Sequence, residues 1–137
     1  MNQTAKTTTY IKFIEFLMLS KHQIYELAAQ HGLSGMQAIT VCFLDQPKPM
    51  HSFNELFGCD PSNVSGIIGG LELKGLVRRF EEPSDHRIKM VDLSSAGQDV
   101  RGELLANLCG PKSSLLAKLS PAETAQFTKL ITKLIQG

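Results

Sequence analysis

The residue types that most often carry chemistry are scattered in this chain. The histidines and cysteines are His22, His31, His51, His86, Cys42, Cys59 and Cys109. No pair of them has the short spacing of a zinc site, and no glycine-rich phosphate loop follows a predicted strand. Only a cysteine and a histidine brought together by folding would supply nucleophilic chemistry. We therefore expect no enzyme, no metal and no cofactor.

The densest group of charges lies between residues 78 and 89. Its basic members are Arg78, Arg79, Arg87 and Lys89, and its acidic members are Glu81, Glu82 and Asp85. Guanidinium groups suit phosphates and the narrow minor groove of DNA, whereas interleaved acids are typical of a solvated hairpin with surface ion pairs. The whole chain has a net charge of +1, so a nucleic-acid surface must come from local charge. The elements around this segment decide between the two interpretations.

Helix-start and helix-stop signals predict six helices. The capping-box pattern, Ser or Thr followed three residues later by Glu or Gln, begins at Ser34, Ser52, Ser95 and Ser120. Gly32, Gly75 and Gly110 stand where helices should end. The predicted helices cover residues 7–31, 35–45, 53–58, 61–74, 95–109 and 121–136.

A two-stranded hairpin is predicted between the fourth and fifth helices. Residues 77–80 and 87–93 are rich in β-formers, and residues 81–86 form the tip. Met90 and Val91 are both apolar, which predicts a bulge or a strand covered on both faces. Helices 53–58 and 61–74, joined by a tight turn, read as a helix-turn-helix. The hairpin after them reads as a wing.

These pieces, in this order, resemble the DNA-binding core of the multiple antibiotic resistance regulator (MarR) family. The resemblance rests on Leu33-Ser34 with Gln37, on LELKGLV from Leu71, on the wing tip PSDHR from Pro83, and on LSSAG from Leu93. It implies a mostly α fold with a small β-wing. The implied domains are an N-terminal dimerisation helix over residues 1–32, a winged helix-turn-helix over 33–93, and C-terminal dimerisation helices over 94–137.

The resemblance also implies which residues meet DNA, with helix 61–74 in the major groove. The expected contacts are Ser62, Asn63, Ser65, Gly66, Gly69, Lys74, Arg78, Asp85 and Arg87, with Gly70 at the edge of the set. Arg87 would enter a minor groove, held by Asp85, while Lys74 and Arg78 would contact phosphates. His86 stands where the family more often has a basic residue, which predicts pH-sensitive binding.

The glycines of helix 61–74 have three interpretations. An interior glycine costs a helix about 1 kcal/mol relative to alanine, so Gly66, Gly69 and Gly70 need a reason. On a DNA-facing surface they bring the backbone close to the duplex and leave specificity to DNA shape. Inside the fold they allow close helix contact. A helix that has lost DNA binding is the third interpretation.

The terminal helices are too apolar to stand alone, which predicts a two-fold dimer. Proteins that resemble the family often bind small aromatic ligands between the dimerisation helices and the winged domain. The candidate lining residues are Phe13, Leu17, His22, Tyr25, Met36 and Phe43. Aromatic residues and Met at helical spacing are equally typical of an ordinary core.

We therefore expect a cytoplasmic, homodimeric transcription regulator, a repressor, that binds a pseudo-palindromic operator in double-stranded DNA. No segment approaches the roughly 20 apolar residues that span a bilayer, and Lys12 and Glu15 interrupt the N-terminal apolar run as no signal peptide would. Two alternatives stay open. Cys59, just before helix 61–74, would make a thiol-based redox sensor if its pKa were lowered there. A winged helix can also serve as a protein-interaction module.

Overall fold

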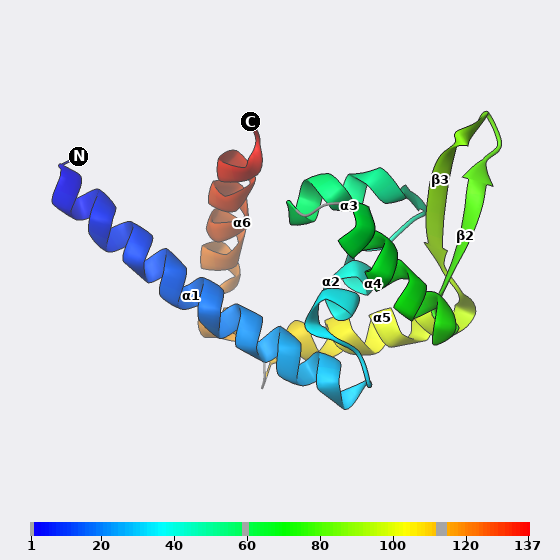
Figure 1. Cartoon of the computed structure of the whole chain (residues 1–137). Helices are drawn as coiled ribbons and strands as arrows, with labels where there is room; N and C mark the ends of the chain where they lie inside the picture. The colour runs from blue at the N-terminus through cyan, green and yellow to red at the C-terminus, as the bar shows by residue number, and fades with distance from the viewer. Residues whose placement is uncertain (1, 59–60, 112–114) are drawn as a thin grey trace. The chain divides into compact units, whose positions relative to one another are not determined.

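The computed structural model describes residues 2–58, 61–111 and 115–137, apart from the side chains of Pro61 and Ser62 (Figure 1). The chain forms two compact units, Met1–Leu104 and Leu105–Gly137. The elements of the first are α1 (Gln3–Gln30), α2 (Gly35–Phe43), β1 (Lys48–Pro49), α3 (Met50–Phe57), α4 (Pro61–Leu73), β2 (Val77–Glu82) and β3 (Asp85–Leu93). Helix α5 (Ser95–Leu108) crosses the boundary, and the second unit adds the 3-10 helix η1 (Leu115–Lys118) and α6 (Pro121–Ile135).

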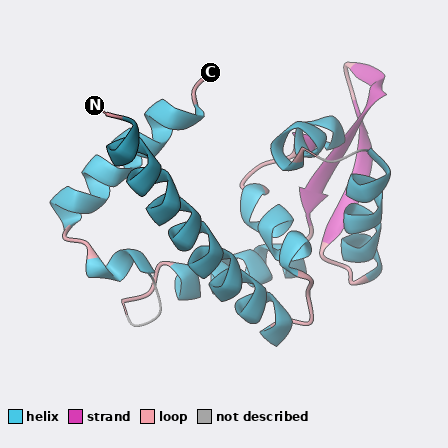
Figure 2. Cartoon of the chain, turned by 60° about the vertical axis from the view of Figure 1, so that its left-hand side comes forward, coloured by secondary structure: helices cyan, strands magenta, loops and turns pink. Residues whose placement is uncertain are grey.

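The mostly helical fold with a small β-wing is confirmed (Figure 2). Each predicted helix is present, and α4 begins at Pro61 as expected. Gly32 and Gly75 follow helices with positive φ angles of 69° and 72°, a conformation that glycine adopts without steric cost. The strands are longer than predicted, since β2 continues to Glu82 and β3 starts at Asp85.

Two of the four predicted capping boxes are formed. The Ser34 and Ser120 hydroxyls accept from the backbone N–H of Gln37 and Glu123, whose side chains accept from the serine N–H in return. The box predicted at Ser52 is wrong, because α3 starts earlier and the Ser52 hydroxyl donates to the Pro49 carbonyl instead.

The box predicted at Ser95 is wrong by one residue. Ser94 precedes α5, and its hydroxyl accepts from the Gly97 N–H at 3.1 Å. The same hydroxyl donates to the Gly75 carbonyl at 2.6 Å. This second bond ties the start of α5 to the end of α4, so a tertiary contact selects between two adjacent serines.

The wing belongs to a three-stranded antiparallel sheet of order β1-β3-β2. The short strand β1 was not predicted. It pairs Lys48 with Val91 and Pro49 with Met90, while β2 pairs Phe80 with Met90 and Arg79 with Val91 on the other side. Met90 and Val91 are both buried, so β3 is covered on both faces. The register shift lies in β2, between Glu81 and Glu82.

The winged domain has a closed core. Helix α4 packs against α2 and α3, and its contribution is Val64, Ile68 and Leu71, which are almost completely buried. Phe53 of α3 is buried with them. Burial of one such side chain stabilises the fold by about 1.5–3 kcal/mol. The core therefore holds α4 with one face inward and the opposite face in solvent.

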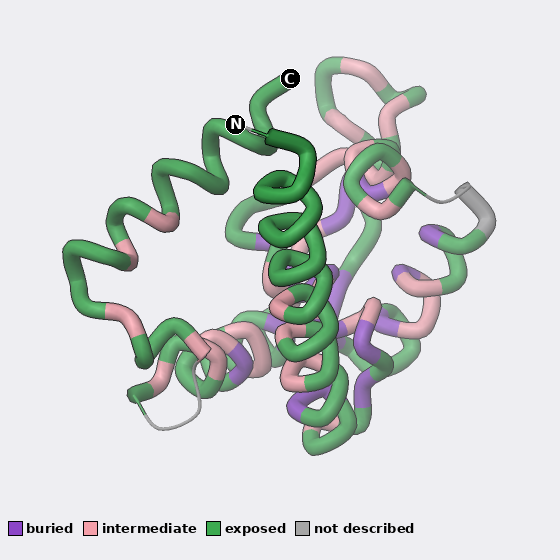
Figure 3. Tube along the Cα trace, turned by 90° about the vertical axis from the view of Figure 1, so that its left-hand side faces the viewer, coloured by how far each residue is buried: buried purple, intermediate pink, exposed green. Residues whose placement is uncertain are grey.

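The terminal helices are different. Most residues of α1 before Leu27 are exposed, and every residue of α6 is exposed or half-buried (Figure 3). Within the described residues, no helix combines the length and the apolar character needed to cross a lipid bilayer.

Candidate nucleic-acid interface

Helix α4 presents its polar residues on the side away from the core. Asn63, Ser65 and Gly66 are exposed, whereas Val64 and Ile68 are buried. This follows from the 3.6-residue period of the helix, which separates the two sets. Two residues of interest lie outside what the structure describes: the side chain of Ser62, expected at the DNA, and Cys59, the candidate redox thiol.

The three interior glycines of α4 occupy three different surroundings. Among the described residues, and apart from the backbone of α4 itself, a Cβ at Gly66 would meet no atom within 4 Å, so this position is open. At Gly70 a Cβ would lie 2.5 Å from Gln37 Nε2, so this glycine lets α2 approach α4. At Gly69 a Cβ would lie 3.3 Å from a terminal nitrogen of Arg79. The DNA-facing interpretation therefore fits Gly66, the interpretation as close contact within the fold fits Gly70, and Gly69 lies beneath an arginine of the wing.

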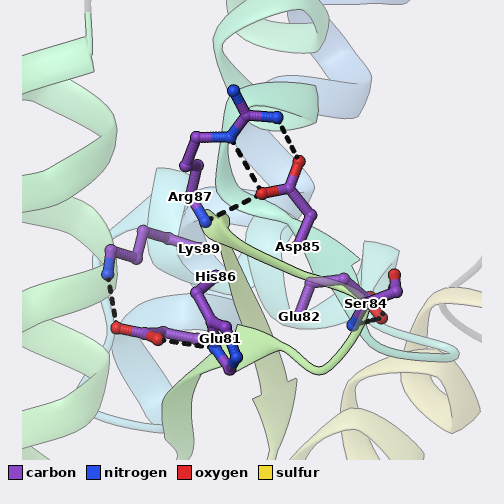
Figure 4. A network of polar contacts seen from close by, with 7 residues as sticks. All are labelled: Glu81, Glu82, Ser84, Asp85, His86, Arg87 and Lys89. Carbon is purple, nitrogen blue, oxygen red and sulfur yellow. Dashed lines mark hydrogen bonds and ion pairs between the residues drawn. The ribbon is translucent and has the colours of Figure 1, made fainter.

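The wing tip is organised around one ion pair (Figure 4). Arg87 Nε and a terminal Arg87 nitrogen each donate to one oxygen of the Asp85 carboxylate at 3.0 Å, and the Arg87 backbone N–H donates to it at 3.1 Å. These bonds lower the pKa of Asp85 and raise that of Arg87, chiefly through the side-chain pair. The Arg87 side chain is nevertheless 91% exposed. Asp85 thus orients Arg87, as the resemblance implied, and leaves its remaining N–H groups toward solvent.

A second set of charges lies beside this pair (Figure 4). The Glu81 carboxylate accepts from Lys89 Nζ at 3.0 Å and lies 3.0 Å from His86 Nδ1. The bond from Lys89 is the main reason that the pKa of Glu81 is lowered. His86 itself is exposed. Glu81 and Asp85 are therefore each paired with bases of the wing, and Arg87 has the most exposed side chain among those bases.

Arg78 and Lys74, the two expected phosphate contacts, differ in how the fold uses them. The Arg78 guanidinium stacks over the Phe80 ring at 4.7 Å and lies 3.7 Å from Asp92, with most of its side chain exposed. Lys74 Nζ donates to the Gly32 carbonyl and, at 3.0 Å, to Gln37 Oε1. The Lys74 ammonium therefore joins the end of α4 to the end of α1, a role that its position in the sequence did not suggest.

The sequence did not indicate that Arg79 and Glu72 form a pair. Arg79 Nε donates to Glu72 Oε1 at 2.9 Å, and a terminal nitrogen of Arg79 donates to the Ser65 carbonyl at 3.4 Å. The two residues lie seven apart in sequence, on a helix and on the following strand. No local spacing rule connects them, because the pair forms only after β2 folds back along α4.

The six candidate ligand residues do not share one environment. Phe13, Leu17 and Phe43 are about half exposed, and His22 pairs with Glu26 at 3.1 Å on the surface of α1. The Tyr25 ring packs so closely on Gly35 that a Cβ there would overlap it, so Tyr25 joins α1 to α2. Met36 is half-buried on α2.

A shallow hollow on α1 is lined by Ile11, Ile14, Glu15, Met18, Leu19 and His22, and shares only His22 with the candidate set. Among the described residues, no group of three or more His, Cys, Asp or Glu side chains is placed to hold a metal ion.

The helix-turn-helix of α3 and α4, followed by the wing of β2 and β3, defines a winged helix-turn-helix protein. Residues 45–89 match the model of the MarR family. This match confirms the resemblance drawn from the sequence over the helix-turn-helix and the wing. No curated protein matches the chain.

Three solved structures share the fold over nearly the whole chain. AbsC, a MarR family transcriptional regulator from Streptomyces coelicolor, is 18% identical with a TM-score of 0.76, covering 98% of this chain and 93% of that one. A mutant of MarR from E. coli, in complex with operator DNA, is 17% identical with a TM-score of 0.71, covering 98% and 99%. MepR from S. aureus, in complex with DNA, is 20% identical with a TM-score of 0.70, covering 93% and 95%.

Proposed function

We propose that this chain is a DNA-binding transcription regulator that acts as a homodimer on a pseudo-palindromic operator. The observation that carries the proposal is that one packed domain presents two exposed elements suited to DNA. These are the polar face of α4 at Asn63, Ser65 and Gly66, and the wing tip with Arg87. MarR and MepR, which share the fold, are solved in complex with DNA.

Helix α4 would enter the major groove. Asn reads adenine bidentately, and Ser contacts bases or phosphates. Gly66 is open, so the helix backbone can come close to the duplex there. Few side chains on this face reach base edges, and the operator would therefore be recognised in large part through DNA shape.

The wing would contact the adjacent minor groove through Arg87. Asp85 accepts two of the five N–H groups that a guanidinium carries. The other three point away from the pair, and a narrow A·T-rich minor groove attracts such a group. Arg78 is better placed than Lys74 for a phosphate, because Lys74 is bonded within the domain.

The terminal helices would form the dimer. Exposed apolar residues on α1 and α6 include Tyr10, Ile11, Leu17, Leu130, Leu134 and Ile135. Two copies that bury these faces against each other would present two α4 helices to successive major grooves about 34 Å apart. A repressor of this design would release DNA when a ligand favours the form with the wrong spacing. The family resemblance supports a small aromatic molecule as that ligand.

Binding to duplex DNA across a range of salt tests the proposal. A fluorescent duplex of random sequence should bind with an affinity that falls steeply as salt rises, because each neutralised phosphate releases counterions. A winged-helix protein-interaction module would show little affinity at any salt.

Substitution of Arg87 tests the role of the wing. For a selected operator, Arg87→Ala should weaken binding by roughly 10-fold or more. Arg87→Lys is the matched variant that keeps the positive charge but loses the planar set of guanidinium N–H donors. Equal affinities for wild type and Arg87→Ala would remove the wing from the mechanism.

A further inference from the structure

The contact between the wing and α4 is built from three positions on one stripe of the helix. Ser65, Gly69 and Glu72 follow each other at four and three residues, so they lie along the same side of α4. Arg79 of β2 lies across this stripe, bonded to Glu72 at one end and to the Ser65 carbonyl at the other. Gly69 lies between them, and a Cβ added at Gly69 would lie 3.3 Å from a terminal nitrogen of Arg79.

The absence of a side chain at Gly69 leaves room for this arrangement. A long side chain at this position would occupy the space that the Arg79 guanidinium fills, and the bond to the Ser65 carbonyl would be lost. The side chains of Arg79 and Glu72 are 33% and 40% exposed, so the pair is partly covered by the helix and the strand that it joins. The small size of Gly69 therefore leaves the space in which the Arg79 guanidinium lies.

Glu72 is poorly suited to contact DNA. It is an acid on the helix that the proposed function places in the major groove, where a carboxylate repels phosphates. Its carboxylate is instead bonded to Arg79 at 2.9 Å. Because the two side chains are bonded to each other, neither presents an unpaired charge to the duplex.

We infer that Arg79 and Glu72, seated on Gly69, are positioning residues that fix the angle between the wing and α4. The inference rests on the proposed function, because the angle matters when Arg87 and the exposed face of α4 must reach adjacent grooves together. The sheet connects this pair to the wing tip. Arg79 lies in β2 opposite Val91 of β3, and Arg87 lies near the start of β3, so a fixed position of β2 also limits the position of Arg87. An ordered wing binds without the entropy loss of ordering it on DNA.

The alternative role for Arg79 is a direct phosphate contact, and the two roles predict opposite results at Glu72. If Arg79 positions the wing, Glu72→Gln weakens binding to a selected operator by about 3- to 10-fold, although it removes a negative charge. If Arg79 contacts phosphate, Glu72→Gln frees the arginine and tightens binding. Arg79→Gln would then also lower the slope of log affinity against log salt by about 1.

Three variants decide between the two roles: Glu72→Gln, Arg79→Gln, and the double variant Glu72→Arg with Arg79→Glu, which exchanges the two charges. The affinity of each is measured for the selected operator and for random duplex. We expect both single variants to lose operator affinity with little change on random duplex or in the salt slope, and the swap to recover part of the loss. Glu55→Gln, a neutralised acid exposed on α3, is the control for charge alone. Tighter operator binding by Glu72→Gln would overturn the inference.

Amide hydrogen exchange of the free protein separates this inference from the proposed function. Both single variants should speed exchange in β2 and at the wing tip, while α1 and α6 exchange as in wild type. Unchanged exchange in β2 would overturn the inference whatever the DNA results. If wild type bound no duplex at all, the proposed function would fail, and faster wing exchange would still show that the pair fixes the wing.

Discussion

The winged domain and the terminal helices treat their apolar side chains in opposite ways. In the winged domain Ile68, Leu71 and Val91 have no exposed surface. In the terminal helices Tyr10 is 65% exposed and Leu134 is 79% exposed. The winged domain therefore buries its core within one chain, whereas α1 and α6 leave large apolar side chains exposed. Exposed apolar patches of this kind mark interaction sites, so the difference supports the proposal that the winged domain presents a fixed surface and the terminal helices form the dimer.

The largest effect should come from a charge on the terminal helices. Leu134→Glu or Leu17→Glu should convert the dimer to monomers in sedimentation velocity, because a carboxylate would be buried in the interface. Operator affinity should then fall on the order of 100-fold, since the second half-site no longer binds within the same complex.

Leu73→Glu is the matched control for that experiment. Leu73 is 92% exposed at the end of α4, so the same charge is added outside the terminal helices and should leave the dimer intact. Two terminal-helix variants that sediment like wild type would show that these faces do not pair, and the contrast between the two regions would fail.

A methyl group added where α5 meets the winged domain should have the next largest effect. A Cβ at Gly97 would overlap the Leu76 carbonyl oxygen, and backbone cannot move aside as a side chain can. Gly97→Ala should therefore destabilise the protein by about 2–3 kcal/mol. Thermal unfolding at fixed protein concentration measures this effect.

Gly102→Ala is the control in the same helix, because a Cβ at Gly102 meets no described atom within 4 Å beyond the backbone of α5 itself. This variant should be stabilised by about 0.5–1 kcal/mol. A destabilisation of equal size at both positions would show that α5 is not closely packed at Gly97.

Gly66→Ala should sharpen the description of the exposed face of α4. No described atom outside the backbone of α4 lies within 4 Å of a Cβ at this position, so the free protein should gain about 1 kcal/mol of stability. Operator binding should weaken at the same time, because the methyl group would hold the backbone away from the duplex. Increased stability with unchanged binding would mean that this part of α4 does not approach DNA.

The smallest effect concerns acid pH at the wing tip. Arg87 lowers the pKa of Asp85 from its ordinary value of 3.8. The ion pair therefore contributes to folding stability at pH values above 3.8, and this contribution is lost as the pH falls through the lowered pKa. In a carboxyl chemical-shift titration, Asp85 should therefore have a lower midpoint in wild type than in Arg87→Gln. Identical midpoints would mean that the two side chains are not paired in solution.

Local signals in the sequence predicted much of the fold. The boxes at Ser34 and Ser120 are confirmed because each is closed by residues three apart. The boxes at Ser52 and Ser95 are wrong because contacts distant in sequence decide those helix starts. Near Ser52, β1 pairs with β3 and α3 starts directly after it. At α5, the Gly75 carbonyl selects Ser94.

In the candidate site, too, contacts between residues close in sequence could be predicted, and contacts between distant residues could not. The pair of Asp85 and Arg87 was expected from the family resemblance, and its partners are two residues apart. The surroundings of Gly69 and Gly70 could not be predicted, because the side chains of Arg79 and Gln37 reach them from other elements. Which glycine of α4 is open is therefore a tertiary property, although the apolar spacing of Val64, Ile68 and Leu71 already fixed the buried face.

Selection of bound sequences from a random duplex pool tests the central claim most directly. The claim is that one rigid winged surface, presented twice by a symmetric pair, reads DNA. Wild type should enrich a pseudo-palindrome whose half-sites are centred about one helical turn apart, and Leu134→Glu should fail to enrich it. A pool that stays random after repeated rounds, or that yields a single asymmetric site, would contradict the account.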